Sequence, residues 1–315
     1  MPSKKSPRHG SLQYWPRKRA SKFLPRVNWD AISSHTSKGL KGFIGYKAGM
    51  ISLVVLDNTA NSMTKGKKIV IPATILECPP MRILSLRLLK NGIVTKEILN
   101  EHLEKELKRK ITLPKKKHNL SEIKIDECDD IHVLVYSETK KTNIKKTPDI
   151  IELGLSGTKE EKFNFAKENW NKEISIQNVF AKGELVDLRG LTKGKGLVGP
   201  VKRFGITLKQ HKSEKGQRRP GSLGPWHPTR VTFRVPMAGQ LGMFTRIIYN
   251  NKIIGMGKPD ENDKRFKGIK NFGDIKTDYV LVRGSVQGVA KRQLILTKTL
   301  RETKKQKKKT FEVME

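Results

Sequence analysis

The sequence contains few cysteines and no long apolar run. Its 315 residues include only Cys78 and Cys128, which are too few for a disulfide framework and lack the paired spacing of a zinc site. No apolar run approaches the roughly 18 to 20 residues of a membrane span, and the opening residues MPSKKSPRHG lack the apolar core of a signal peptide. We therefore expect an intracellular protein without disulfides, a zinc centre or a membrane anchor.

Acidic residues are also scarce. The chain has 30 Asp and Glu against 65 Lys and Arg, a formal net charge of +35 at pH 7. A compact body with that excess repels itself unless a polyanion neutralises it, and nucleic acid does so by releasing condensed counterions. The composition predicts a polyanionic partner, with a basic enzyme as the alternative.

Motifs for catalysis are missing. The seven histidines form no H-E-x-x-H, no G-x-S-x-G occurs, and the basic stretches hold too few acids for a carboxylate pair. KGKGLVG, residues 193–199, does contain G-x-G-x-x-G after the strand-like ELVDLRGLT. A dinucleotide turn needs a helix at the third glycine and an acid about 20 residues on, but Gly205 comes too soon for a helix and position 219 is Arg.

A phosphate-binding loop is excluded as well, because GLTKGK is followed by Gly196 where Ser or Thr is required. We expect no enzyme, no cofactor and no metal. A nucleotide-dependent enzyme built on the glycine motif remains the competing hypothesis, and titration with NAD or ATP would distinguish the two.

Alternating and β-branched patterns predict a mainly β protein. Strand-like segments are expected at 42–57, 67–80, 82–89, 131–136, 175–190, 243–257, 278–288 and 291–298, with a bulge or close backbone approach near Gly45 and Gly49 and turns at Asn91-Gly92 and Asn250-Asn251. Leucines at i, i+4 spacing predict a helix over 96–110, and a capping box from Thr158 to Glu161 predicts a second helix ahead of Trp170.

Charge divides the chain into regions. Residues 82–175 hold 16 acids and 20 bases, so this block is nearly neutral. We predict a β-barrel interrupted twice, by an α/β insertion and by a basic excursion. The expected regions are an arm (1–41), a barrel (42–90, 176–190 and 238–300), an inserted α/β domain (91–175), an extended basic loop (191–237) and a basic tail (301–315).

The arm and the loop have the composition of RNA-binding segments. The arm has ten bases and one acid, four prolines that rule out a continuous helix, and the aromatics Tyr14, Trp15, Phe23 and Trp29 available to stack on bases. The loop has eleven bases and the single acid Glu214. The alternatives are a disordered solubilising arm, a Trp226 that folds back onto the barrel instead of stacking on RNA, and duplex DNA as the polyanion.

Several long blocks resemble the large-subunit ribosomal protein three family in its archaeal and eukaryotic form, and the chain length is similar to that of archaeal members. They cover the chain from about Pro7 to about Leu296: PRHGSLQYWPRKRA, GFIGYKAGM, ECPPMRI, TKGKGLVGPVKRFGI, RRPGSLGPWHPTR, MAGQLGMFTR and SVQGVAKRQLIL. The resemblance implies a translation-protein-type β-barrel with an inserted α+β domain, a long extended N-terminal arm and a central basic loop.

The resemblance also implies a function and partners. It implies a structural protein of the large ribosomal subunit in the cytoplasm, which binds near the 3′ end of 23S-type rRNA, nucleates subunit assembly and extends its loop toward the peptidyl-transferase centre. Large-subunit proteins fourteen and twenty-four e are the implied neighbours, with no membrane and no homo-oligomer. Charge and the resemblance together nominate as rRNA-binding residues Arg8, His9, Arg17, Lys18, Arg19, Lys193, Lys195, Lys202, Arg203, Lys209, Lys212, Arg218, Arg219, Trp226, His227 and Arg230.

Overall fold

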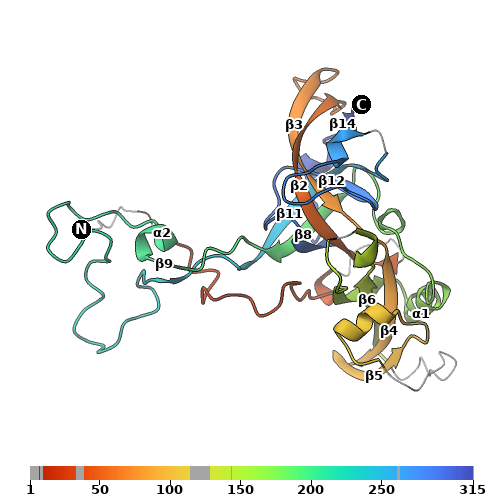
Figure 1. Ribbon diagram of the computed structural model, residues 1–315, viewed down its shortest axis with the longest axis horizontal. Helices are drawn as coiled ribbons and strands as arrows, with labels where there is room; N and C mark the ends of the chain where they lie inside the picture. Colours follow the sequence, from red (N-terminus) through yellow and green to blue (C-terminus); the bar gives the residue numbers. More distant parts are fainter. Residues whose placement is uncertain are drawn as a thin grey trace. The chain divides into compact units, whose positions relative to one another are not determined.

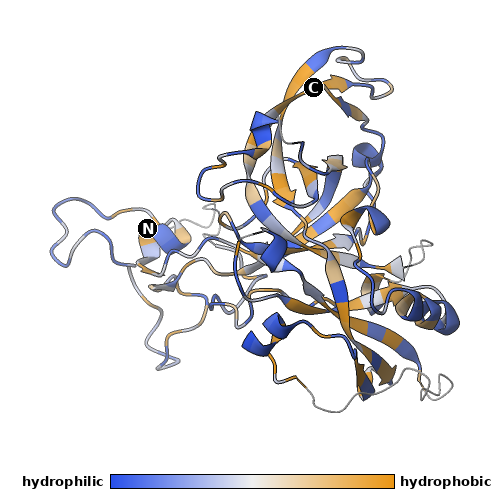
Figure 2. Cartoon of the chain, turned by 45° about the vertical axis from the view of Figure 1, so that its right-hand side comes forward, coloured by the Kyte–Doolittle hydropathy of each residue, from blue (hydrophilic) through white to orange (hydrophobic). Residues whose placement is uncertain are grey.

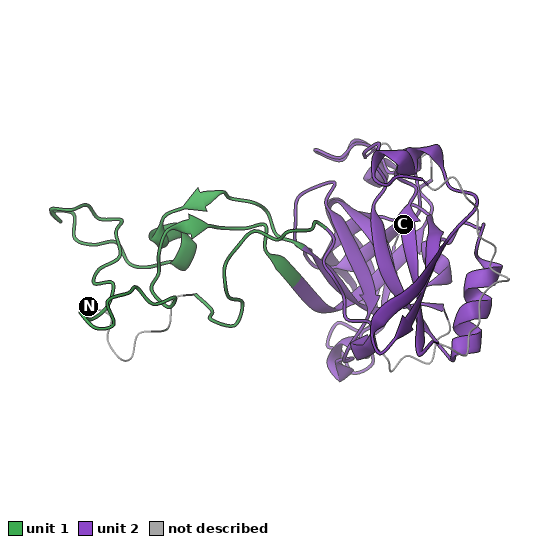
Figure 3. Cartoon of the chain, turned by 90° about the horizontal axis from the view of Figure 1, so that it is seen from below, with its two compact units in different colours: residues 1–23, 191–246 green, residues 24–190, 247–315 purple. Residues whose placement is uncertain are grey.

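The computed structural model describes residues 7, 10–32, 39–113, 128–142, 144–260 and 263–314. The chain forms two compact units (Figure 3), which we treat separately. Unit 1 comprises Met1–Phe23 and Leu191–Arg246, and unit 2 comprises Leu24–Gly190 and Ile247–Glu315. Unit 1 contains 19 Lys and Arg but only one acid, Glu214, so nearly all of the acids lie in unit 2.

Antiparallel strands dominate unit 2 (Figure 1), which confirms the expectation of a mainly β chain. Its larger sheet has the strand order β13-β8-β11-β12-β3-β2-β14, and β13 also pairs with β2, so the pairings of six strands return to their starting strand. The strands are β2 (Gly42–Asp57), β3 (Lys68–Glu77), β8 (Leu185–Leu191), β11 (Thr245–Gly257), β12 (Tyr279–Arg283), β13 (Gln293–Lys298) and β14 (Phe311–Val313).

Two irregularities bend the long strands of this sheet. The register of β2 against β3 shifts between Lys47 and Gly49, which confirms the expected bulge. The expected hairpin turn at Asn250-Asn251 is wrong, because β11 runs through both residues. Asn250 has a φ of 56° and its N–H donates to Asp187 at 2.8 Å, so a tertiary hydrogen bond stabilises a kink where the dipeptide alone suggests a reversal.

The second sheet has five antiparallel strands in the order β1-β7-β6-β4-β5. Residues 81–90, expected in the barrel segment 42–90, pair instead with β5 and β6 of this second sheet. The strands are β1 (Gly39–Leu40), β4 (Met81–Lys90), β5 (Ile93–Leu99), β6 (Asp130–Ser137) and β7 (Ile150–Ser156).

The helix expected over 96–110 is wrong. Asn91 and Gly92 have φ values of 51° and 72°, which close a tight hairpin between β4 and β5, and the β-branched start of β5 continues the ladder. The leucines still converge, because Leu107 is fully buried on the 3-10 turn η2 (Lys105–Arg109), with Leu99 and Leu103 packed beside it. The spacing identified a shared apolar face but not the backbone that forms it.

The expected capping box at Thr158 is confirmed. The Thr158 hydroxyl accepts from the Glu161 N–H, and the Glu161 carboxylate accepts from the Thr158 N–H, at the start of α1 (Lys159–Glu168). Short 3-10 turns complete the unit, and α3 (Lys304–Lys307) precedes β14. The turns are η1 (Asp30–Ile32), η5 (Thr139–Thr142), η6 (Ile176–Asn178) and η7 (Lys264–Phe266).

Among the described residues, the three clusters of buried apolar side chains all lie in unit 2, whose strands carry the apolar segments in Figure 2. The main cluster joins residues of both sheets, including Phe43, Ile83 and Leu296. Trp29 also belongs to it, with only 5 % of its surface exposed and its indole N–H donating to the Glu152 carbonyl. The expectation that Trp29 stacks on RNA is therefore wrong.

Unit 1 has little regular structure. It contains β9 (Leu197–Val198) paired with β10 (Gly239–Gln240), and the one-turn helix α2 (Pro200–Phe204). The expectation that Gly205 prevents a helix is wrong: Pro200 occupies the first turn, and Gly205, with a φ of 70°, ends the helix one turn later. β9 pairs antiparallel with β10, unlike the strand of a dinucleotide-binding unit.

Candidate nucleic-acid interface

A short antiparallel neck connects the ends of the basic loop. The N–H of Thr192 donates to the Phe244 carbonyl, that of Lys195 to Leu241, and that of Leu241 to Gly196, at 2.9 to 3.0 Å. Gly242 lies inside this neck with a φ of 78°, and a Cβ there would lie 1.9 Å from the Lys193 carbonyl oxygen. Glycine is therefore required at this position, because the two strands approach too closely for a side chain.

Arg203 of α2 fastens the arm to the loop. Its Nε–H donates to the Gln240 carbonyl at 2.9 Å, one Nη to Met237 at 3.0 Å, and the other Nη to Arg17 at 3.1 Å. Arg17 reciprocates by donating to the Arg203 carbonyl at 2.8 Å. The planar fork of a guanidinium suits this arrangement, because one side chain can satisfy several carbonyls in fixed directions.

In unit 1, aromatic rings of the arm and the loop lie close together. The Trp15 ring lies 5.5 Å from that of Phe233 and 6.5 Å from that of buried Phe204. The Arg17 guanidinium lies 4.2 Å from the Phe204 ring centroid. The Ala20 N–H donates to the Met243 carbonyl at 2.9 Å, which holds the arm along the loop without either segment forming a sheet.

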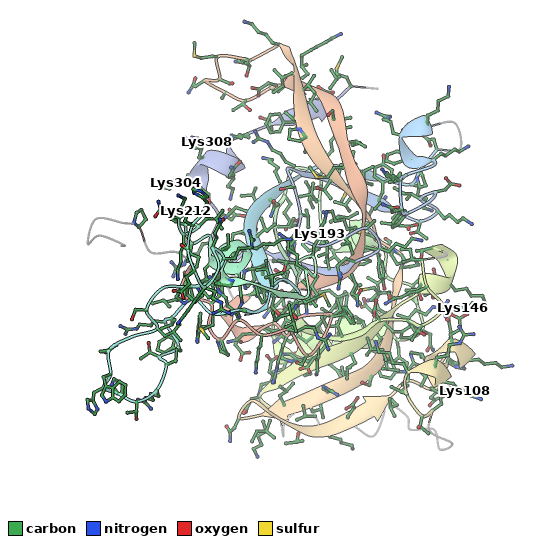
Figure 4. The ribbon with its side chains drawn as sticks, turned by 60° about the vertical axis from the view of Figure 1, so that its left-hand side comes forward. Lys108, Lys146, Lys193, Lys212, Lys304 and Lys308 are labelled. Carbon is green, nitrogen blue, oxygen red and sulfur yellow. The ribbon has the colours of Figure 1, made fainter. Side chains whose placement is uncertain are left out.

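Most of the nominated basic residues lie in solvent. Ten of the nominated basic residues, among them Lys193 (Figure 4), have exposed side chains, and in the described part of the chain none of the ten takes part in an ion pair. This group, which we call the unit 1 cations, comprises Lys18, Arg19, Lys193, Lys195, Lys202, Lys209, Lys212, Arg218, Arg219 and Arg230. Their concentration on a segment with one acid creates a positive potential suited to a polyanion.

The loop tip carries an exposed tryptophan. Residues 221–230 are all exposed, and Trp226 retains 85 % of its surface while His227 lies beside it. A tryptophan seldom remains so exposed in a folded chain, because its apolar ring gains free energy by leaving water. Its exposure does not fit the alternative in which Trp226 packs back onto the strands.

The nominated residues thus fall into three groups. The unit 1 cations, Trp226 and His227 are exposed, whereas Arg17 and Arg203 are half-buried and bind backbone carbonyls. Arg8 and His9 lie outside the described residues. Sequence reasoning did not single out Arg246, whose guanidinium lies 4.4 Å from the ring centroid of half-exposed Tyr14. The two residues are distant in sequence, so no local pattern indicates their contact.

Unit 2 contains the one arrangement with metal-ligand spacing among the described residues, Asp30, Asp130 and His132. The chemistry of the donor set does not suit a cation. Lys162 Nζ contacts Asp130, and the His132 ring nitrogens face Asp130 at 3.6 Å and Glu152 at 2.7 Å. The Asp130 carboxylate is already paired with the Lys162 ammonium and faces the His132 ring, so we interpret Asp130, His132, Glu152 and Lys162 as an ion-pair cluster.

Comparison with known proteins identifies the family. The model of the ribosomal protein L3 family matches residues 1–314. The chain belongs to the ribosomal protein L3 family. Curated relatives named large ribosomal subunit protein uL3 include those of Methanosphaera stadtmanae (39 % identical over 95 % of this chain and 93 % of the relative) and Archaeoglobus fulgidus (38 %, with 95 % and 93 % covered). That of Methanocaldococcus jannaschii is 39 % identical, with 94 % and 91 % covered.

Membership in the L3 family establishes the general role. The family is structural and non-enzymatic, and the chain is a structural constituent of the large subunit of the cytoplasmic ribosome. The enzyme hypothesis based on the glycine motif is therefore excluded, and the resemblance noted in the sequence is confirmed. Separately, the helices of the described residues include none long and apolar enough to cross a membrane.

Proposed function

We propose that this protein binds 23S-type rRNA near its 3′ end through unit 1, and that this contact nucleates assembly of the large subunit. The observation that carries the proposal is the exposure of the unit 1 cations without carboxylate partners among the described residues. Phosphates would supply the missing counter-charge, and counterion release would supply much of the binding free energy.

The internal contacts of unit 1 support binding by a preorganised segment. Arg203 and the Trp15, Phe204 and Phe233 rings join arm and loop before any RNA is present. A loop ordered in advance loses less conformational entropy on docking. Arg17 and Arg203 contribute by holding backbone in place and Lys193 and Lys195 by meeting phosphates, so we assign both groups to the rRNA-binding surface, together with Arg8 and His9 of the arm.

We further propose that the loop tip extends toward the peptidyl-transferase centre, with Trp226 and His227 entering the RNA. A stacked base contributes about 1 to 3 kcal/mol, and the 85 % exposure of Trp226 makes its ring available for such a contact. Large-subunit proteins fourteen and twenty-four e are the proposed neighbours, an assignment that rests on family resemblance.

For unit 2 we propose a translation-protein-type β-barrel with an inserted α+β domain. The ring of pairings through β13, β8, β11, β12, β3 and β2 supports a closed barrel. The separate sheet containing β4 to β7, with α1 beside it, supports the inserted domain. We also propose that an arm, a basic loop and a basic tail accompany this barrel.

The salt dependence of RNA binding tests the proposal. The full chain should bind a 3′-domain fragment of large-subunit rRNA with an affinity that falls steeply with salt, by a log–log slope of about −0.7 per neutralised phosphate. Lys193→Ala/Lys195→Ala should reduce that slope by roughly 1 to 1.5, because two phosphate contacts are lost. The matched control is Lys108→Ala/Lys146→Ala, which removes two exposed lysines of unit 2 (Figure 4).

Three outcomes would contradict the proposal. A slope near zero would show that phosphate contacts do not drive binding. If the unit 1 and control variants changed the salt dependence of binding equally, any lysine on the surface would contribute alike, and unit 1 would not be a specific RNA-binding surface. Competition by duplex DNA as strong as by the rRNA fragment would favour the DNA alternative, because RNA recognition depends on single-stranded bases and 2′-hydroxyls.

A further inference from the structure

The carboxyl-terminal segment of unit 2 forms regular secondary structure that its sequence does not suggest. RETKKQKKKT has the composition of a low-complexity tail, yet Lys304–Lys307 forms α3 and Phe311–Val313 pairs with β2 as β14. Lysines at the start of a helix oppose its dipole, and lysines at i, i+4 repel each other. Local propensity therefore does not account for α3, and tertiary contacts must hold it.

Three sets of hydrogen bonds hold the segment at its start, middle and end. The Thr303 N–H donates to the Asn250 side chain at 3.0 Å, at the kink in β11. Buried Lys252 donates its Nζ to the Lys307 carbonyl at 3.0 Å and to Gln306 at 3.5 Å, where a cation also suits the end of the helix. The N–H of Asn58 donates to the Thr310 carbonyl at 3.0 Å.

These contacts gather cations that repel one another. Lys304 begins α3 and Lys308 follows its last residue (Figure 4), and both are exposed. Burial, with the nearby charges of Arg283 and Lys305, lowers the pKa of Lys309, although Asp57 opposes the shift. Among the described residues, Glu302 forms an ion pair with Lys307. We call Lys304, Lys305, Lys308, Lys309 and Arg283 the α3 surface.

We propose that the α3 surface is a second phosphate-binding site, which takes the sugar-phosphate backbone of the RNA independently of unit 1. The inference rests on the proposed rRNA binding and extends it to a different unit and different residues. A protein that fixes like charges together against their repulsion destabilises its free form, and a bound polyanion removes that repulsion. RNA is favoured over an acidic peptide because the groups that this surface presents are closely spaced cations, which suit a continuous run of phosphates; the half-buried Phe311 ring lies under Arg283.

The test compares three double variants in the full chain, with protein-free large-subunit rRNA as the probe. Lys304→Ala/Lys308→Ala should weaken binding about tenfold at moderate salt and make the log–log slope shallower by roughly 1 to 1.5. Lys304→Arg/Lys308→Arg keeps the charge and should restore both quantities. Lys108→Ala/Lys146→Ala removes the same charge from another face of unit 2 and should leave the slope unchanged.

Lys252→Met gives a second readout, because it removes the contact that positions α3 without removing an exposed charge. This variant should bind the rRNA more weakly, and its circular dichroism spectrum should show the same strand content as the parent protein. A photocrosslinker at position 308 in assembled large subunits should react with RNA; a crosslink to protein alone would overturn the inference.

The outcomes separate this inference from the proposed function. If Lys193→Ala/Lys195→Ala weakens binding but the α3 alanine variant behaves like the control, only the α3 surface is refuted. If neither variant differs from the control, rRNA binding through unit 1 fails as well.

Discussion

His132 shows how one side chain can join several strands. It is buried on β6, with one ring nitrogen 2.7 Å from Glu152 of β7 and the other 3.6 Å from Asp130. Burial alone would lower its pKa, but the hydrogen bonds and charges of Asp130 and Glu152 outweigh burial and raise it to about 9. Arg87 and Lys162 complete the cluster by pairing with Glu152 and Asp130, respectively.

This pKa predicts a pH-dependent stability. Because the folded-state pKa lies above the unfolded value near 6.5, the stabilisation is complete below about pH 6.5 and is lost as pH rises through about 9. After discounting for solvent screening, we expect the protonated His132 to contribute about 1 to 2 kcal/mol to the free energy of unfolding. Thermal unfolding between about pH 6 and 9 should show this loss, and His132→Gln should flatten the dependence.

The control is His102→Gln, since His102 is exposed outside the cluster. An unchanged pH profile in His132→Gln, or the same change in His102→Gln, would argue that the cluster does not titrate through His132.

At the scale of elements, the neck and α2 connect segments far apart in sequence. Arg203 has the same local signature as its neighbour Lys202, since both stand in a glycine-rich basic run. In the structure Lys202 is exposed, whereas Arg203 binds three backbone carbonyls and its burial lowers the pKa of its guanidinium. Its structural role follows from its position on α2.

Arg203→Lys should therefore loosen the arm without unfolding unit 2. An ammonium keeps the charge but cannot reach three carbonyls in fixed directions, so about 1 to 3 kcal/mol of arm docking should be lost. Limited trypsin cleavage at Arg17, Lys18 and Arg19 should become about tenfold faster or more. Lys202→Arg is the matched control, and equal cleavage rates in the two variants would contradict the role of Arg203.

Elements differed in how well their sequences predicted them. Thr158 to Glu161 and Asn91-Gly92 were predicted correctly, because capping and turn formation depend on a few adjacent residues. The 96–110 segment and Asn250 were not, because a ladder with β4 and a hydrogen bond from the Asn250 N–H to the Asp187 carboxylate overrode local preference. In the candidate interface, the exposed cations and Trp226 could be nominated from the sequence. The Tyr14–Arg246 contact could not, because the two residues are distant in sequence.

On the scale of the whole molecule, the buried apolar clusters and the segments almost free of acids lie in different units. All three apolar clusters belong to unit 2, and unit 1 carries 19 Lys and Arg with one acid. Stability and RNA binding should therefore be separable by removing part of the chain.

Replacing residues 194–242 by a short glycine–serine turn tests this separation. Thr192 and Phe244 already pair, so the shortened loop can close as a hairpin. The melting temperature should change by no more than about 3 °C, because no core residue of unit 2 is removed. Affinity for the rRNA fragment should fall by at least about two orders of magnitude, because many phosphate contacts disappear together. Loss of the unfolding transition would show instead that the loop belongs to the core.

Composition predicted the class of partner, and hydrophobic alternation predicted the positions of most strands. These properties depend on residue types and on neighbouring residues, so they can be recognised without knowledge of the fold. The fold, by contrast, distinguishes the cations that face solvent from those that donate hydrogen bonds inside the protein. Lys193 and Arg203 both stand in the same basic run, but Arg203 donates a hydrogen bond to the carbonyl of Arg17, 186 residues away. Lys252 likewise donates to the carbonyl of Lys307 in α3. Whether a charge is available to a ligand depends on the carbonyls and carboxylates that distant segments bring to it, and local sequence does not specify them.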